Sequence, residues 1–229
     1  MEDNIISYLE MCNREGASLQ RGMNFRLRGG HSVILMSVAD NAPYQDRVED
    51  GGETLVYEGH NQPARQDSPD PKRLDQLAQL PSGRPTDNGK FADAARSYRD
   101  HERAPHIVQV YEKIKKGIWS DNGFFELIDS WRESDGHRQV FKFKLRAIAL
   151  GRSEAATPTE PHIKRRIIPS AVKLEVWKRD RGRCVECGAA DELHFDHIVP
   201  FSKGGTSLSA KNVQLLCARH NLKKHAHIR

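Results

Sequence analysis

The stretch Asp196-His-Ile-Val-Pro-Phe-Ser-Lys-Gly-Gly205 lies between two short pairs of metal-binding residue types, and together they decide the C-terminal fold. Cys184-Val-Glu-Cys187 precedes the stretch and Cys217-Ala-Arg-His220 follows it. A two-residue gap lets one turn aim both ligands of a pair at a single point, and thiolate with imidazole suits zinc. The spacing therefore predicts a structural Zn²⁺ site whose ligands are Cys184, Cys187, Cys217 and His220.

Two alternatives accompany the zinc interpretation. In the first, the cysteines are reduced and unligated. In the second, His225 replaces His220 as the fourth ligand, although the spacing favours His220. A module of about 60 residues buries too little apolar surface to be secure alone, so a structural metal would contribute to its stability. Cys12 lies far from both pairs in the sequence and receives no role.

The C-terminal residues resemble the HNH (ββα-metal) nucleases over roughly residues 170–225. The resemblance implies two strands and a helix around one catalytic divalent metal, often beside a zinc site. Two features depart from the family's commonest pattern: His220, where Cys is more usual, and Asn221 as the last residue of the motif. The residues that carry the resemblance are Asp196-His197, Gly204-Gly205, Asn212, Leu216-Cys217 and His220-Asn221-Leu-Lys-Lys224.

The same resemblance assigns roles by position. His197 matches the general base that activates water, and Asn212 matches the residue that braces the loop bearing this base. Asp196 and Asn221 match the ligands of the catalytic metal. Oxygen ligands suit Mg²⁺ or Mn²⁺, and neutral imidazole is a competent base near pH 7. The alternative for His197 is an ordinary surface histidine, and His194 is expected to be structural or close to phosphate.

Hydrophobic patterns predict several elements along the chain. Residues 4–11 follow a helical spacing, which predicts a short amphipathic helix. Lys142, Lys144 and Arg146 share one face of a predicted strand, where they are expected to face solvent, with phosphate contact as an equal alternative. We further expect strands at 32–38, 54–57, 106–113, 138–146 and 193–198, and helices at 88–98, at 171–181 with Ser170 as N-cap, and from Ala210 or Asn212 onward.

An ordered series of motifs within residues 14–150 resembles the SRA (YDG) domain. The family folds as a curved, PUA-like β-barrel with flanking helices. It binds DNA that carries 5-methylcytosine or 5-hydroxymethylcytosine and flips the modified base into a pocket. The resemblance therefore implies an N-terminal domain that reads modified bases. The motifs that carry it are residues 32–37, 44–52, 56–61, 88–91, 108–111, 123–131 and 140–145.

The chemistry of such a pocket selects candidate residues. A flipped cytosine needs aromatic faces for stacking and a carboxylate that accepts from its exocyclic N4 amine. Tyr44 and Tyr57 are the candidates for stacking, and Asp46 is the candidate carboxylate. In the alternative, the tyrosines are barrel aromatics and Asp46 is a turn residue. His60 and Asn61 either reach DNA or close a turn.

The charge distribution divides the chain. Among its 229 residues, positions 1–151 hold 21 Lys and Arg against 23 Asp and Glu, whereas positions 152–229 hold 15 against 8. The basic C-terminal part favours a polyanionic partner, with a solvated basic surface as the alternative. We therefore predict an α+β protein with an SRA-like DNA-binding domain at 1–150, a proline-containing linker at 151–169 and an HNH nuclease domain at 170–229.

The sequence also indicates the compartment. No apolar run approaches the roughly 20 residues that cross a bilayer. The N-terminus Met-Glu-Asp-Asn is acidic and lacks the pattern of a secretory signal, and the four cysteines do not form a disulfide framework. We expect a cytoplasmic protein with no membrane partner.

Together these patterns predict a modification-dependent DNA endonuclease of the restriction type. Its expected substrate is double-stranded DNA with modified cytosine. Because one HNH site cuts one strand at a time, we expect a homodimer or two binding events. The alternatives are an HNH nickase or endonuclease with a different N-terminal specificity, and a zinc-stabilised DNA-binding protein without catalysis.

Overall fold

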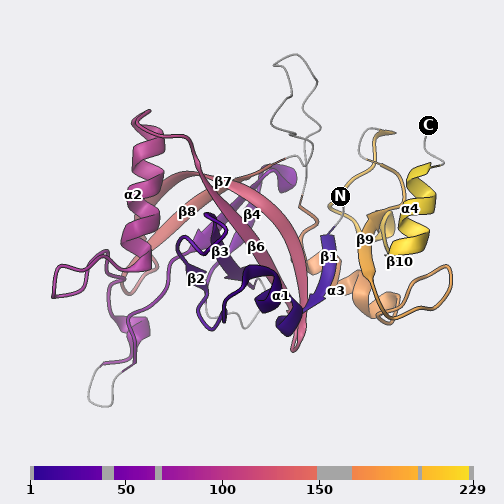
Figure 1. Cartoon of the computed structure of the whole chain (residues 1–229), viewed down its shortest axis with the longest axis horizontal. Coiled ribbons are helices and arrows are strands. Elements are labelled where there is room, and N and C mark those ends of the chain that lie inside the picture. The colour runs from indigo at the N-terminus through magenta and orange to yellow at the C-terminus, as the bar shows by residue number, and fades with distance from the viewer. Residues whose placement is uncertain (1–2, 38–43, 65–68, 149–166, 201–202, 227–229) are drawn as a thin grey trace.

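The computed structural model describes residues 3–37, 44–64, 69–148, 167–200 and 203–226 (Figure 1). The architecture is mixed α+β, as predicted, and no helix among these residues is long and apolar enough to cross a membrane. The helices are α1 (Tyr8–Glu15), α2 (Asp87–Arg99), α3 (Ser170–Arg179) and α4 (Ala218–Ala226). The strands are β1 (Asp3–Ser7), β2 (Met23–Asn24), β3 (Ser32–Met36), β4 (Arg47–Glu49), β5 (Thr54–Glu58), β6 (His106–Lys115), β7 (Ile118–Ser134), β8 (Gln139–Ala147), β9 (Leu193–His197) and β10 (Val213–Cys217).

Seven strands form a strongly curved sheet in the order β2-β3-β6-β7-β8-β5-β4. β3 and β6 pair in parallel, and the other neighbours are antiparallel. The 17-residue strand β7 is the spine of this sheet, and α2 lies across one end of it (Figure 1). Phe91 of α2 packs against Phe25 and Phe143 in the main core. The predicted strands at 32–38, 54–57, 106–113 and 138–146 and the helix at 88–98 are confirmed, with small shifts at their ends.

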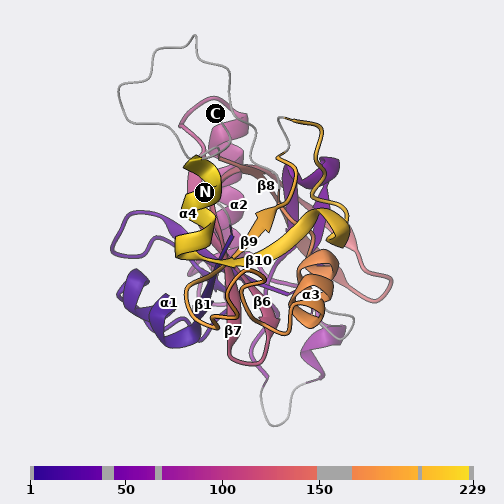
Figure 2. The same cartoon turned by 90° about the vertical axis from the view of Figure 1, so that its right-hand side faces the viewer.

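The C-terminal residues form the predicted ββα arrangement. β9 and β10 pair in antiparallel fashion, and α4 follows β10 directly. A separate core holds this unit together; Val176 of α3, Phe195 of β9 and Leu215 of β10 are each fully buried in it. Helices α4 and α3 lie on opposite sides of these two strands (Figure 2).

The first strand joins the two parts of the molecule. Asn4 of β1 pairs with Asp121 of β7 on one side and with His194 of β9 on the other. All ten strands of the described residues therefore belong to one sheet. Figure 1 shows β1 between β7 and β9, where it bridges the curved sheet and the ββα unit.

Three predictions about element ends are wrong. Residues 4–7 form β1 rather than helix, because their alternating side chains fit between two strands; α1 begins at Tyr8, where the Ser7 hydroxyl caps the N–H of Glu10. Ser170 does not cap α3, because its hydroxyl donates to Glu112 instead. The final helix begins at Ala218, since residues 213–217 pair with β9 as a strand.

The predicted linker lies largely outside the described residues, which resume at Ile167. Ile167 is buried in the core of the curved sheet, and its N–H donates to the carbonyl of Gly52 at 2.7 Å. The next residue, Ile168, is buried in the core of the ββα unit. The chain therefore enters α3 with one residue in each core.

Candidate functional site

Four predicted metal ligands converge in the ββα unit. Cys184, Cys187, Cys217 and His220 place their ligand atoms within 4.8 Å of one another. His220 Nδ1 lies 3.5 Å from Cys184 Sγ and 3.3 Å from Cys217 Sγ. Three thiols and one imidazole at this spacing match the donor set of a tetrahedral structural zinc site.

The local backbone prepares this cluster for a cation. Burial raises the pKa of Cys184, but N–H groups of Cys217, Cys187 and Glu186 outweigh burial and bring this pKa down to about 6. A thiolate is the form that ligates zinc. The side chain of His225, the alternative ligand, lies outside the described residues, whereas His220 belongs to the cluster.

A second polar group lies at the end of β9. Asp196 is buried, and its Oδ2 accepts from Gln214 Nε2 at 2.9 Å and from Lys224 Nζ at 2.5 Å. Gln214 is the residue opposite Asp196 on β10, and Lys224 comes from α4. Neither residue was predicted to have a role, and the position of Gln214 opposite Asp196 is visible only once the strand register is known.

Asn221 is the predicted ligand from the helix. It is 7% exposed, and its Oδ1 has no hydrogen-bond partner within the described part of the chain. Lys224 lies three residues later, on the same face of α4, and its ammonium group holds Asp196. A buried carbonyl oxygen without a donor is costly, so it fits a site that receives a cation. The oxygen donors of Asp196 and Asn221 are those that Mg²⁺ and Mn²⁺ prefer.

His197 follows Asp196 and is half-buried. Its Nε2 lies 2.9 Å from the Ser207 hydroxyl, a partner that sequence analysis did not identify. The Asn212 amide spans the loop between β9 and β10: it accepts from the N–H of Val199 at 2.9 Å and donates to the carbonyls of Val199 and Thr206 at 3.0 Å. These bonds are those of a residue that braces the loop, and its catalytic role stays a prediction.

Only glycine fits at position 205 of that loop. A Cβ there would lie 1.8 Å from the Val199 carbonyl oxygen and 2.8 Å from Asn212 Nδ2. The second glycine of the Gly204-Gly205 pair thus permits the close approach that the Asn212 hydrogen bonds require.

In the curved sheet, Asp46 lies where β4 and β5 meet. Its two carboxylate oxygens accept from the N–H of Glu58 at 2.9 Å and of Ser37 at 3.3 Å. Burial raises the pKa of Asp46 to about 7, against the opposing effect of these N–H groups. Each oxygen retains capacity for a second hydrogen bond. The group is therefore a buried carboxyl that titrates near neutral pH.

The two candidate stacking residues differ in exposure. Tyr44 is half-buried, and Lys72 Nζ lies 4.8 Å from its ring centre. Tyr57 is 1% exposed, packs in the main core and donates to the carbonyl of Gly22 at 3.1 Å. After burial, the Asp46 charge is the next influence that raises the pKa of Tyr57, so these groups are neighbours. A stacking role for either ring stays a prediction.

The prediction for the basic face of β8 is wrong for Lys142. This residue is 1% exposed, and its ammonium group lies 2.9 Å from Glu58 Oε2, the residue opposite it on β5. Its neighbours on that face are also paired, Lys144 with Glu49 at 3.8 Å and Arg146 with Glu126 at 2.6 Å. Arg146 is exposed, as predicted, although it too pairs with a carboxylate.

His60 and Asn61 were expected to reach DNA or to close a turn. The His60 N–H donates to Asn88 Oδ1 at 3.0 Å, and Asn88 Nδ2 donates back to the His60 carbonyl at 2.9 Å. The Gln76 amide contacts Asn61 Oδ1 at 3.5 Å. These bonds tie the segment after β5 to the start of α2, and contact of either residue with DNA stays a prediction. His194 is half-buried, and burial lowers its pKa.

Residues 184–227 match the family model of HNH endonucleases. A search of curated proteins found no match. Among solved structures, the SRA domain of SUVH5 bound to fully hydroxymethylated CG DNA is 24% identical with a TM-score of 0.43, over 71% of this chain and 92% of that one.

Two further solved structures are similar. KRYPTONITE in complex with mCHG DNA and SAH is 16% identical with a TM-score of 0.42, over 69% of this chain and 34% of that one. The Type IV phosphorothioation-dependent restriction endonuclease ScoMcrA is 14% identical with a TM-score of 0.45, over 100% of this chain and 55% of that one. The family match covers the Cys₃His cluster, Asp196, His197 and Asn221, and residues 184–227 of this chain are therefore an HNH endonuclease domain.

Proposed function

We propose that this chain is a modification-dependent DNA endonuclease that recognises 5-methylcytosine or 5-hydroxymethylcytosine and hydrolyses phosphodiester bonds. In this proposal residues 1–150 form the domain that reads the modified base, residues 151–169 form the linker, and residues 170–229 form the nuclease domain that cuts the DNA. The protein acts in the cytoplasm as a restriction enzyme and cuts both strands as a homodimer. The observation that supports the nuclease activity is the buried Asn221 carbonyl oxygen, which has no hydrogen-bond partner among the described residues, within the HNH match.

The cutting step assigns a task to each residue of the HNH site. His197, whose ring is oriented by Ser207, takes the proton from the attacking water. Asp196 and Asn221 would hold Mg²⁺ or Mn²⁺, and such an ion, when bound, would supply stabilisation of negative charge on the phosphate and on the departing oxygen. Asn212 holds the loop that carries His197 in place. The Cys₃His cluster binds Zn²⁺ and stabilises the ββα unit without taking part in hydrolysis.

The reading step uses the group around Asp46. An ionised Asp46 accepts from the N4 amine of a flipped cytosine, and Tyr44 is the half-buried ring beside it. Flipping costs a few kcal/mol, which the hydrogen bond and stacking offset. The buried ion pair of Glu58 and Lys142 is adjacent to Asp46, because the backbone N–H of Glu58 donates to the Asp46 carboxylate. This pair fixes the carboxylate rather than contacting the base.

The test is digestion of matched duplexes that carry cytosine, 5-methylcytosine, 5-hydroxymethylcytosine or glucosylated cytosine, with Mg²⁺ or Mn²⁺ and sequencing of the cut ends. We expect cutting of the methylated or hydroxymethylated duplex and loss of cutting in His197→Ala. Asp46→Ala is expected to cut without preference. Equal cutting of all four duplexes by the parent protein would show an HNH nuclease of another specificity, and no cutting with retained binding would show a DNA-binding protein.

A further inference from the structure

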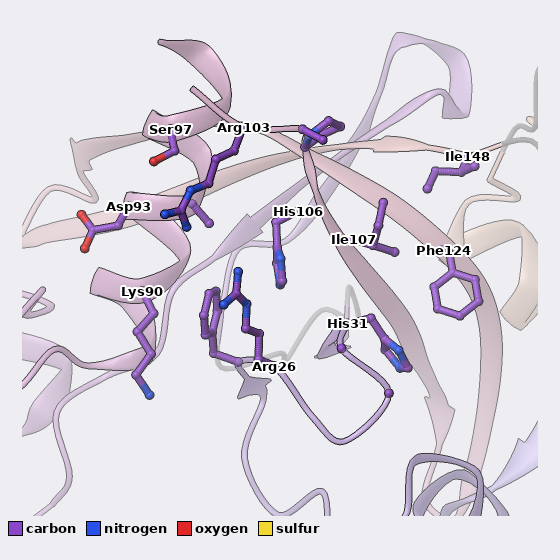
Figure 3. A pocket seen from close by; sticks show the side chains of 16 residues that line it. Arg26, His31, Lys90, Asp93, Ser97, Arg103, His106, Ile107, Phe124 and Ile148 are labelled. Atoms are coloured by element: carbon purple, nitrogen blue, oxygen red, sulfur yellow. The ribbon is translucent and has the colours of Figure 1, made fainter. Parts of the chain in front are cut away.

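A cavity of about 830 Å³ opens between the β2–β3 connection, α2 and the first residues of β6 (Figure 3). Its volume lies within the range of small-molecule pockets, about 300–1,000 Å³. It shares no lining residue with the proposed cytosine pocket or with the HNH domain. The residues that give it its chemistry are Phe25, Arg26, His31, Arg103, His106 and Phe124.

The charge of this cavity is uncompensated and positive. Its Lys90 and Asp93 each form an ion pair with a residue outside the lining, at 2.8 and 2.6 Å. Arg26 and Arg103 have no acidic partner among the residues that the structure describes. Two guanidinium groups at one cavity form a site for an anion, and their planar donors match the oxygens of a phosphate.

Arg26 is held in place by a constrained backbone. Its φ of 47° lies in the left-handed region, which non-glycine residues seldom adopt. Residues with such a strained backbone cluster at ligand-binding sites. Its N–H donates to the Ser32 hydroxyl at 2.9 Å, and the same hydroxyl lies 2.6 Å from His106 Nε2. Ser32 is completely buried, so one fixed group positions the Arg26 backbone and the His106 ring.

Apart from Ser97, the remaining lining is mainly aromatic and apolar. The His106 ring stacks on Phe25 with ring centres 4.9 Å apart and an interplanar angle of 26°. Burial lowers the pKa of His106, and the positive charge of Arg26 lowers it further, so the ring is neutral at pH 7. Phe124 meets His31 edge to face at 5.3 Å. Figure 3 shows the Arg26 and His106 side chains side by side, with His31 and Phe124 further along the lining.

We propose that this cavity binds a nucleotide, with its phosphate on Arg26 and Arg103 and its planar base on the aromatic and apolar side. The chemistry recognised is a phosphate joined to a planar ring. Two sources supply it: a free nucleotide that acts as an effector, or one nucleotide of a DNA strand outside the cytosine pocket. This inference stands apart from the proposed cutting activity, because it is tested by binding alone.

The experiment uses the full chain with His197→Ala, so that DNA is not cut. Calorimetry measures binding of AMP, of dCMP and of inorganic phosphate without DNA, and a fluorescence titration measures binding of an unmodified duplex at several salt concentrations. The test variant is Arg26→Gln/Arg103→Gln. The matched control is Arg99→Gln, an exposed α2 arginine outside the lining that pairs with Asp129. Both arginines of the test variant are exposed, so the fold is expected to be retained.

A free nucleotide is the source if the parent binds AMP or dCMP and the double variant loses about tenfold in affinity per arginine, as for hydrogen bonds to charged groups. A DNA strand is the source if mononucleotides do not bind but the duplex affinity falls and its salt slope decreases by about two. The proposal is overturned if the double variant and Arg99→Gln have the same affinities for all ligands.

Discussion

Lys173 of α3 and Glu112 of β6 form a fully buried ion pair, with Lys173 Nζ 2.9 Å from Glu112 Oε2. The same ammonium group donates to Asn122 Oδ1 at 2.7 Å and contacts Ser120 Oγ at 3.1 Å, and both residues belong to β7. A buried charge is tolerated only where its partners are in place. This network therefore gives the helix of the nuclease unit one docking position on the curved sheet.

Breaking this pair is expected to destabilise the whole protein. Lys173→Met leaves the Glu112 carboxylate buried and unpaired, which costs about 3–5 kcal/mol in the free energy of unfolding. Lys173→Met/Glu112→Met removes both charges and is expected to recover much of that loss. Urea denaturation measures both, with the exposed Lys178→Met as control. If Lys173→Met were as stable as Lys178→Met, the ion pair would not contribute to the stability of the protein.

If the proposed function holds, the same network predicts a narrow distribution of cut positions. Because α3 has one docking position, the parent is expected to cut at a fixed separation from the modified base. The double variant is expected to cut over a wider range. Sequencing of cut ends from a duplex with one modified base measures the distribution. A wide distribution from the parent, with modification dependence intact, would contradict fixed docking but not the reading activity.

Loss of zinc is expected to unfold the ββα unit. Structural zinc contributes about 10–16 kcal/mol in small zinc-binding peptides, more than a unit of this size gains from its core. Cys184→Ser is therefore expected to lose the metal and the folded signal of residues 184–226. Metal analysis and protection of backbone amides from hydrogen exchange measure the two effects. Cys12→Ser is the control, since Cys12 lies outside the cluster, and it is expected to keep about one zinc per chain.

The raised pKa of Asp46 predicts two pH effects. Its pKa is about 7 in the folded protein against 3.8 ordinarily, so the folded state binds the extra proton between these values. This residue therefore lowers stability by a few kcal/mol as pH rises from about 4 to 7, and Asp46→Asn is expected to remove that fall. The ionised form accepts from cytosine N4, so preference for modified DNA in the His197→Ala protein is expected to rise through pH 7. If the preference of the His197→Ala protein for modified DNA did not change with pH, Asp46 would not be the acceptor.

The sequence predicts the C-terminal unit well because its signals are local. Cys184 and Cys187 are separated by two residues, and so are Cys217 and His220, so each pair of zinc ligands can be recognised without knowing the strand register. The burial and pairing of Lys142 were not predictable in this way, because its partner Glu58 lies 84 residues away and meets it only through the β5–β8 register. The helical spacing of residues 4–7 misled for the same reason: pairing with distant strands overrides local propensity.

The position of β1 determines how this nuclease can be transplanted. Asp3 and Asn4 cover the edge of β9, so a cassette cut out as residues 170–229 would expose a row of unpaired backbone groups and invite aggregation. A recombination junction in the segment before α3 would likewise separate β1 from the ββα unit, whose sheet β1 completes. A working graft needs a circularly permuted design in which residues 3–7 are joined to the nuclease unit by a new loop. Wherever the ββα unit is placed, it therefore needs a strand beside β9.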